Sequence, residues 1–175
     1  GVLPGEKVTK EIAEARGIPI GIRCESPAWH SAFSTPIELM EFVAQLREKS
    51  GGKPVGFKMC VGKRHEVMAM MKAMIETGIR PDFIVVDGAE GGTGAAPAEF
   101  MDHVGAPLRD GLVFVRNALV GAGLKDEIRL ACAGKQITAF SLASSMALGA
   151  DWVHTARGFM LALGSIQSLH CHDNT

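Results

Sequence analysis

The stretch Ile84-Val85-Val86-Asp87-Gly88-Ala89-Glu90-Gly91-Gly92-Thr93-Gly94-Ala95-Ala96-Pro97 joins a short apolar run to a glycine-rich segment. The apolar residues are mostly β-branched, which is typical of a strand covered on both faces. The glycines that follow remove side chains where a flat or anionic ligand can approach the backbone. Ordering such a loop costs conformational entropy, which a bound ligand can offset. The stretch therefore predicts a buried strand leading into a ligand-binding loop, with a flexible connection as the alternative.

Strands and helices alternate on both sides of this stretch. A helix is expected after Thr35, because Thr35 can cap it, Pro36 suits its first turn and Glu38 completes a capping box. Four strand patterns follow, each with a helical pattern behind it. The strands are expected over 55–60, 83–87, 130–133 and 152–155, and the helices over 66–77, 98–103 with 108–120, 138–148 and 159–169. This alternation predicts parallel β/α units.

The β/α pattern alone is compatible with two folds. Four units make half of a (β/α)₈ barrel, and they also suit an open doubly wound sheet. Residues 1–34 are expected to be an irregular N-terminal segment with a short helix over 8–16, and residues 35–175 to hold the β/α units. Half a barrel would leave open sheet edges, so we expect it to be poorly stable alone.

Composition bounds the class of protein. Hydrophobic residues at 47% and charged residues at 21% are typical of one globular domain. A net charge of −1 gives no field that would attract nucleic acid or an anionic membrane. We find no apolar run of membrane-spanning length and no signal-peptide pattern. The four cysteines are far apart, which favours reduced thiols and a cytoplasmic location. Cys60 and Cys132 are expected to be small core residues.

Three separated motifs resemble the FMN-binding domain of the glutamate synthase family, in the same order. The motifs are Asp87-Gly88 with Gly91-Gly92-Thr93-Gly94-Ala95, the lead-in Leu3-Pro4-Gly5-Glu6-Lys7-Val8-Thr9, and Ala162-Leu163-Gly164 followed by Cys171-His172-Asp173-Asn174-Thr175. The resemblance covers nearly the whole chain and extends to the shorter, stand-alone members. It implies the C-terminal half of a (β/α)₈ TIM barrel. Residues 1–175 would then be a single, incomplete FMN-binding domain, a fragment of a longer protein.

The catalytic candidates lie on the first two strands. By alternation Gly56, Lys58 and Cys60 face the barrel interior, where a lysine is costly without an anionic partner. Asp87 is inward on the next strand, so a Lys58–Asp87 pair is expected. The resemblance places Lys58 beside the flavin and the substrate, where its charge stabilises the anionic reduced flavin. Glu90 stands where the family more often has an aspartate. The alternatives are a structural or solvent-directed Lys58 and a solvated loop acid at Glu90.

The phosphate candidates follow the last two strands. Ala133-Gly134-Lys135 follows the third strand, and Ala156-Arg157-Gly158 follows the fourth and begins a helix. Loops after the last two strands of a barrel, with a helix N-terminus, are its usual phosphate site. Lys135 and Arg157 can add charge, although either can equally be a surface residue. The expected cofactor-binding set is Lys58, Gly88, Gly91, Gly92, Thr93, Gly94, Gly134, Lys135, Ala156, Arg157 and Gly158.

The end of the chain bears on iron–sulfur chemistry. By resemblance, three cysteines of the family hold a [3Fe–4S] cluster; the first falls at Ser165, the second at Cys171 and the third would lie past Thr175. Serine is a poor replacement for a thiolate ligand. From this chain alone a [3Fe–4S] cluster cannot form.

The resemblance implies an FMN-dependent oxidoreductase that reduces 2-iminoglutarate, formed from 2-oxoglutarate and ammonia, to L-glutamate. NAD(P)H, through a partner subunit, or ferredoxin would supply the electrons, and an amidotransferase domain outside this chain would supply ammonia from glutamine. Two alternatives stay open: an FMN-dependent TIM-barrel oxidoreductase with a different substrate, and a non-catalytic flavin- or phosphate-binding module.

Overall fold

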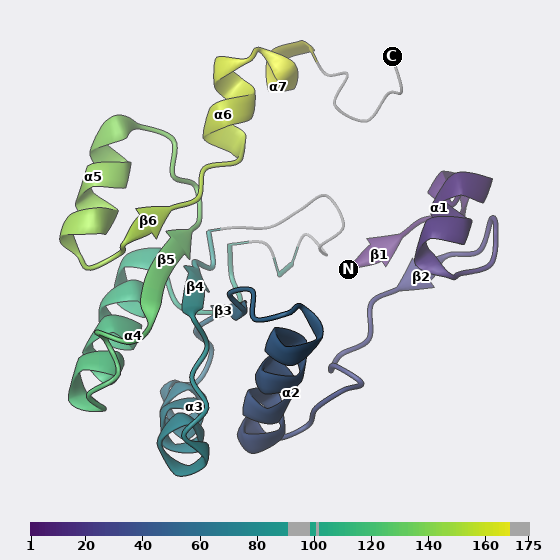
Figure 1. Cartoon of the computed structure of the whole chain (residues 1–175). Coiled ribbons are helices and arrows are strands. Elements are labelled where there is room, and N and C mark those ends of the chain that lie inside the picture. The colour runs from purple at the N-terminus through teal and green to yellow at the C-terminus, as the bar shows by residue number, and fades with distance from the viewer. Residues whose placement is uncertain (91–98, 101, 169–175) are drawn as a thin grey trace.

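The computed structural model describes residues 1–90, 99–100 and 102–168. Its main element is a parallel sheet in the order β3 (Gly56–Cys60), β4 (Phe83–Asp87), β5 (Arg129–Ala133) and β6 (Trp152–Val153) (Figure 1). Helices α2 (Pro36–Lys49), α3 (Arg64–Thr77), α4 (Leu108–Gly121), α5 (Ala139–Ala147), α6 (Arg157–Ala162) and α7 (Ser165–Ser168) alternate with these strands or flank them. The predicted parallel β/α arrangement is confirmed.

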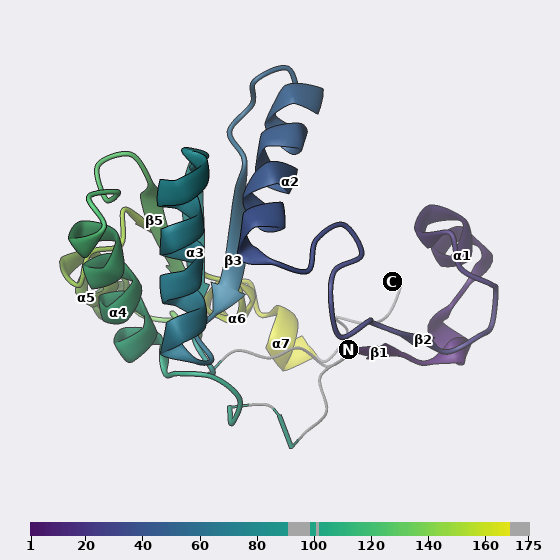
Figure 2. The same cartoon turned by 90° about the horizontal axis from the view of Figure 1, so that it is seen from below.

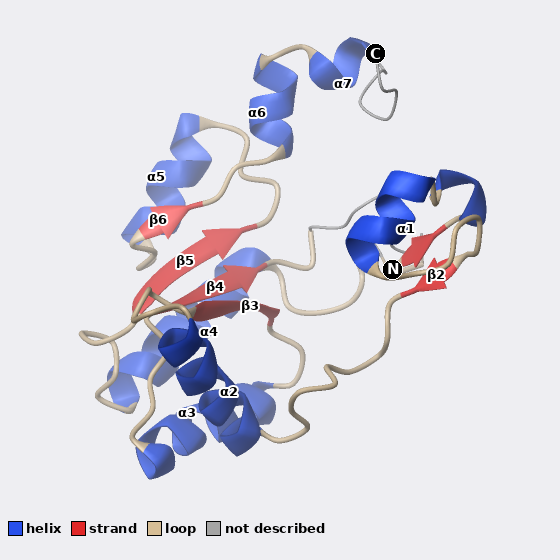
Figure 3. Cartoon of the chain, turned by 45° about the vertical axis from the view of Figure 1, so that its right-hand side comes forward, coloured by secondary structure: helices blue, strands red, loops and turns tan. Residues whose placement is uncertain are grey.

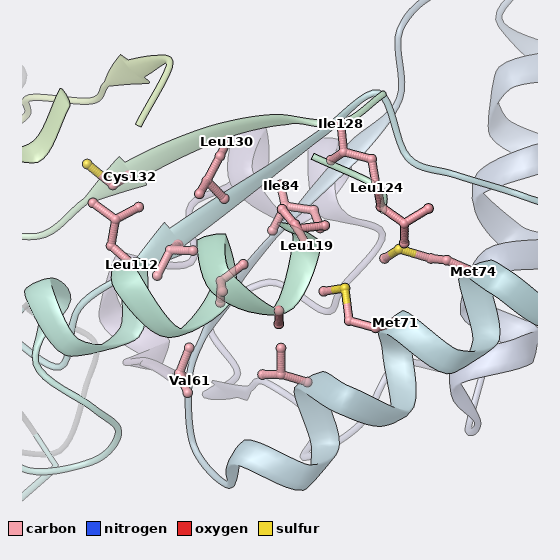
Figure 4. Packing of buried hydrophobic residues seen from close by; sticks show 14 of the residues in the cluster. Val61, Met71, Met74, Ile84, Leu112, Leu119, Leu124, Ile128, Leu130 and Cys132 are labelled. Carbon is pink, nitrogen blue, oxygen red and sulfur yellow. The ribbon is translucent and has the colours of Figure 1, made fainter. Parts of the chain in front are cut away.

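The hydrophobic core lies on one face of this sheet. Ile84 and Val86 of β4 and Leu130 and Cys132 of β5 are fully buried. Figure 4 shows Ile84, Leu130 and Cys132 on the side of the sheet where the side chains of α3 and α4 pack. In Figure 3 the helices α2, α3 and α4 lie together on one side of the strands. A doubly wound sheet has helices on both faces. In this sheet the strand residues that alternate with the core residues, among them Lys58, point to the opposite face. That face borders a pocket. One-sided cover is the arrangement expected for half of a barrel.

The strand expected over 83–87 is confirmed at the bounds of β4. The signals that predicted a helix after Thr35 are confirmed by α2. Thr35 Oγ1 accepts a hydrogen bond from Glu38 N–H at 3.2 Å, and the Glu38 carboxylate accepts one from Thr35 N–H at 3.2 Å. Hydrogen bonds from Ser34 hold the pKa of Glu38 below its ordinary value. The capping box therefore forms as the sequence predicts.

A carboxylate joins α2 to the amino ends of β3 and β4. Asp82 Oδ2 accepts hydrogen bonds from Val55 N–H at 2.7 Å and from Arg47 Nη2 at 2.9 Å. Burial alone would raise the pKa of Asp82, but these hydrogen bonds outweigh burial and hold the pKa below its ordinary value. This end of the sheet is the one where barrels carry stabilising residues.

Two expected helices are wrong in part. The described residues of the helix expected over 98–103 are turns, because Asp102 has a φ of 64°, which breaks a right-handed helix. The helix expected over 159–169 is divided into α6 and α7 by Gly164, whose φ is 74°. Cys132 is buried as expected, whereas Cys60 is exposed, because it lies at the carboxyl end of β3 next to the pocket face.

The N-terminal segment is more regular than expected. β1 (Val2–Leu3) and β2 (Cys24–Glu25) form an antiparallel pair around η1 (Gly5–Lys7) and α1 (Lys10–Arg16). Figure 2 shows this unit set apart from the four-stranded sheet. Among the described residues, none of the helices has the length and apolar character needed to cross a membrane.

Candidate functional site

A pocket of about 420 Å³ opens at the carboxyl ends of the strands, on the sheet face opposite α2, α3 and α4. This volume is within the range of small-molecule sites. Strands β3, β4 and β5, the loops after β5 and β6, and the first residue of α6 contribute to the pocket. Its lining residues are Lys58, Val85, Asp87, Ala133, Gly134, Lys135, Gln136, His154, Thr155, Ala156 and Arg157. The structure therefore brings most of the described site candidates into one place.

Lys58 and Asp87 form an ion pair across β3 and β4. Lys58 Nζ lies 2.7 Å from Asp87 Oδ2, with 56% of the lysine and 25% of the aspartate side chain exposed. In the parallel register Lys58 is paired with Val85, and Cys60 is paired with Asp87. Because residues two apart on a strand share a face, Asp87 lies diagonally across from Lys58 on the same face of the sheet. The expected ion pair is thus present. Because both groups reach solvent, the pair contributes on the order of 1 kcal/mol or less to stability, and Lys58 stays accessible from the pocket.

The loop after β5 adopts an unusual backbone conformation. Gly134 has a φ of 132° and Lys135 a φ of 42°, a value that residues with a side chain rarely adopt. A Cβ at Gly134 would lie 3.2 Å from Gly88 N, and Gly88 N–H donates to Ala133 O at 2.9 Å. The start of the glycine-rich loop therefore packs directly on the loop after β5. Gly88 is not among the lining residues and contacts the pocket loop through Ala133 and Gly134.

The loops after β5 and β6 are also joined to each other. Thr155 Oγ1 donates to Gln136 O at 2.8 Å. A Cβ at Gly158 would lie 2.8 Å from Thr155 Oγ1 and 2.9 Å from Gln136 O. Only glycine fits at the start of α6 while these loops remain in contact. Gly158, like Gly88, is not among the lining residues.

The two loop cations are close to one carboxylate. Lys135 Nζ lies 2.8 Å from Asp102 Oδ1, and this hydrogen bond holds the pKa of Asp102 below its ordinary value. The charge of Arg157 acts in the same direction, so both cations are near Asp102. Lys135 is therefore paired in the structure, although it remains part of the pocket lining.

Glu90 lies outside the pocket lining and contacts the N-terminus of α4. Both of its carboxylate oxygens accept from Leu108 N–H, at 2.9 and 3.0 Å. A carboxylate in this position satisfies a free N–H group and complements the helix dipole. Burial, followed by the charges of Asp87 and Glu90, raises the pKa of the Cys60 thiol. Cys60 is therefore mostly protonated at neutral pH.

Five of the candidate residues cannot be placed. Gly91, Gly92, Thr93, Gly94 and Cys171 lie outside the described residues. Ser165 begins α7. Within the described part of the chain, no three His, Cys, Asp or Glu side chains gather as metal ligands would.

Three polar pocket residues, together with the apolar Val85, were missed by the sequence reasoning. Gln136 and Thr155 join the two loops, and His154 Nε2 accepts a hydrogen bond from Trp152 Nε1 at 3.0 Å. The strand expected over 152–155 ends at Val153 in the structure, so His154 lies in the loop directly after β6. A shorter expected strand would have marked His154, because functional residues of barrels follow the strands. Nothing in the local sequence marked Gln136, because two of its partners, Ser145 and Thr155, are 9 and 19 residues away along the chain.

The fold and the pocket define a β/α protein with a cation-bearing site at the carboxyl ends of parallel strands. The chain belongs to the glutamate synthase family, because the family described as a conserved region in glutamate synthase matches residues 1–175. This agrees with the resemblance carried by the three sequence motifs.

Individual relatives agree with this assignment. The chain is 40% identical over 175 residues to the glutamate synthase large subunit-like protein YerD of Bacillus subtilis, covering 100% of this chain and 33% of the relative. It is 36% identical over 165 residues to the archaeal-type glutamate synthase [NADPH] of Thermotoga neapolitana, covering 94% of this chain and 32% of the relative. The chain thus spans about one third of the length of these relatives. Among solved structures, a flavocytochrome b2 variant with sulfite bound has a TM-score of 0.49 and 16% identity over 90% of this chain and 33% of that one.

Proposed function

We propose that this chain supplies part of the cofactor and substrate site of an FMN-dependent oxidoreductase of the glutamate synthase type. The observation that carries the proposal is the meeting of Lys58 with both glycine–cation loops around one pocket. Membership of the glutamate synthase family supports the reaction class. The half-barrel arrangement supports a site at this end of the strands.

The pocket chemistry fits FMN. A phosphate dianion needs N–H donors and cations, and the loops after β5 and β6 line the pocket with Gly134 and Lys135 and with Ala156 and Arg157. The anionic end of a flavin ring needs a nearby cation, and Lys58 lies on the strand face that borders the same pocket. We assign the two loops to the phosphate and Lys58 to the ring.

The roles of the acidic residues follow from their contacts. Asp87 holds Lys58 at 2.7 Å and so fixes where the lysine charge is placed. Glu90 holds the first turn of α4 and thereby the chain that leaves the glycine-rich loop. We propose that Asp87 acts through Lys58 and that Glu90 acts on loop structure. Gly91, Gly92, Thr93 and Gly94 remain proposed cofactor contacts.

When bound, FMN would supply the two-electron chemistry that reduces 2-iminoglutarate, derived from 2-oxoglutarate and ammonia, to L-glutamate. Lys58 is also suited to hold a carboxylate of this dicarboxylic substrate. The electrons would come from NAD(P)H or ferredoxin through a protein partner, in the cytoplasm. Cys171 stays a candidate iron–sulfur ligand only if residues beyond this chain complete the set, since Ser165 stands at the position of the first ligand.

The full-length gene product provides the test. It should purify with FMN, and anaerobically reduced protein should reoxidise when 2-oxoglutarate and ammonia are added, with L-glutamate formed in equal amount. FMN binding with no response to 2-oxoglutarate would favour an FMN oxidoreductase with another substrate. Bound FMN that no physiological donor reduces would favour a non-catalytic flavin-binding module. A protein that does not bind FMN would overturn the proposal.

A further inference from the structure

Both polar atoms of the Gln136 side-chain amide form hydrogen bonds. Its Nε2 donates to Gly134 O at 3.0 Å, and its Oε1 accepts from Ser145 Oγ at 2.9 Å. Its main-chain oxygen accepts from Thr155 Oγ1 at 2.8 Å. One residue therefore connects the loop after β5, helix α5 and the loop after β6.

The anchor on α5 is a buried group. Ser145 is only 4% exposed and is the one buried polar residue of the described core. Burial raises the pKa of the Cys132 thiol, and the nearby Ser145 side chain acts in the opposite direction. Buried hydroxyl groups almost always have partners, and losing one is costly. Gln136 is thus fixed to the interior of the protein rather than to a mobile surface group.

The hydrogen bond from Gln136 Nε2 to Gly134 O fixes the direction in which the Lys135 N–H group points. Gly134 C=O and Lys135 N–H belong to one planar trans peptide unit and point in opposite directions. Successive N–H groups in turns that include a left-handed residue form concave anion-binding sites. Within the described part of the chain, the N–H groups of Lys135 and Gln136 have no hydrogen-bond partner. These donors are available for an anion in the pocket.

We propose that Gln136 is a positioning residue for the phosphate group of the cofactor, acting with Ser145. This inference rests on the proposed function. Gln136 does not have to contact the phosphate. It holds the Gly134–Lys135 peptide in the orientation that binds an anion, and it keeps the loop after β6 at the correct distance.

The test compares FMN with riboflavin, which lacks the phosphate, as ligands of the full-length protein stripped of cofactor. Gln136→Met keeps the length of the side chain and removes both of its hydrogen bonds. Ser145→Ala removes the anchor and leaves Gln136 itself unchanged, at a residue that does not line the pocket. Ser144→Ala, on the same helix and with no side-chain hydrogen bond to Gln136, is the matched control.

Loss of the Gln136 contacts should weaken FMN binding by about tenfold, and loss of the Ser145 anchor by about fivefold, with riboflavin binding unchanged. Ser145→Ala should add nothing to Gln136→Met, and Ser144→Ala should match the wild type. Equal weakening of both ligands would show a merely structural role and overturn the inference. Unchanged FMN binding in both variants would overturn it too. If Gln136→Met fails to fold, Ser145→Ala decides alone.

The wild type distinguishes this inference from the proposed function. A wild-type protein that binds riboflavin as tightly as FMN has no phosphate site, and the proposed function then fails at that point. A wild type that prefers FMN, with variants that keep the preference, leaves the phosphate site in place and removes Gln136 from it.

Discussion

Replacing Gly158 with alanine should disrupt the contact between the two pocket loops. In an open helix the change would be neutral or stabilising by up to about 1 kcal/mol, because alanine favours helix. At Gly158, however, the new methyl group would lie 2.8 Å from Thr155 Oγ1, 2.9 Å from Gln136 O and 3.0 Å from Ile137 Cα. Two of these atoms are backbone and cannot rotate away.

The cost can be divided into parts. Displacing Thr155 removes its hydrogen bond to Gln136, which contributes about 1 kcal/mol. Overpacking against the backbone costs about 1–3 kcal/mol. Set against the gain in helix propensity of about 1 kcal/mol, the net loss of stability should be about 2 kcal/mol.

Urea unfolding of the cofactor-free full-length protein measures this loss, and FMN titration should show binding weakened by about tenfold. Gly121→Ala is the matched control, because Gly121 also lies in a helix and its added methyl group would meet no atom within 4 Å. If Gly158→Ala behaves like Gly121→Ala in both assays, the two loops are not in the contact described here.

Three further predictions follow from other residues of the chain. Lys58→Met should lower the reduction potential of the bound flavin by roughly 30 mV or more in a redox titration, while Lys53→Met, on an exposed loop, should not; no shift would separate Lys58 from the ring. Glu90→Ala should cost about 1 kcal/mol in urea unfolding through the loss of the α4 contact, with FMN affinity within about twofold; a larger loss of FMN affinity would point to a direct cofactor role. The pKa of Asp82 is held below its ordinary 3.8, so its contribution to stability is present above that pH and is lost as the pH falls through the lowered pKa. Asp82→Asn should therefore lower stability at pH 7 and flatten the acid limb of the unfolding profile, and an unchanged acid limb would contradict the assigned contacts.

Local signals in the sequence were enough to predict much of the fold. The capping pair Thr35 and Glu38 marks the start of α2, and the apolar run ending at Asp87 marks β4 at its observed bounds. Alternation along β3 correctly placed Lys58 on the pocket face. The errors occur where the backbone conformation of a single residue determines whether a helix forms or ends. Gly164 ends α6, and Asp102 takes a left-handed conformation, for which residue type gives only a weak preference.

The candidate site shows the same division. Lys58, Asp87 and the two glycine–cation loops were predictable, because parallel strands bring their carboxyl ends to one edge. Gln136 and Ser145 were not, because each is ordinary in its own local sequence and gains its role from a partner nine residues away. A hydrogen bond of this kind is determined by how α5 packs on the sheet.

We propose that one pocket at the carboxyl ends of the parallel strands holds the flavin nucleotide. A crystal structure of the full-length protein with FMN tests it most directly. The phosphate should lie within hydrogen-bonding distance of the N–H groups of the loops that contain Gly134 and Gly158, and the ring should lie beside Lys58. FMN bound at a different surface, with this pocket filled by protein side chains, would contradict it.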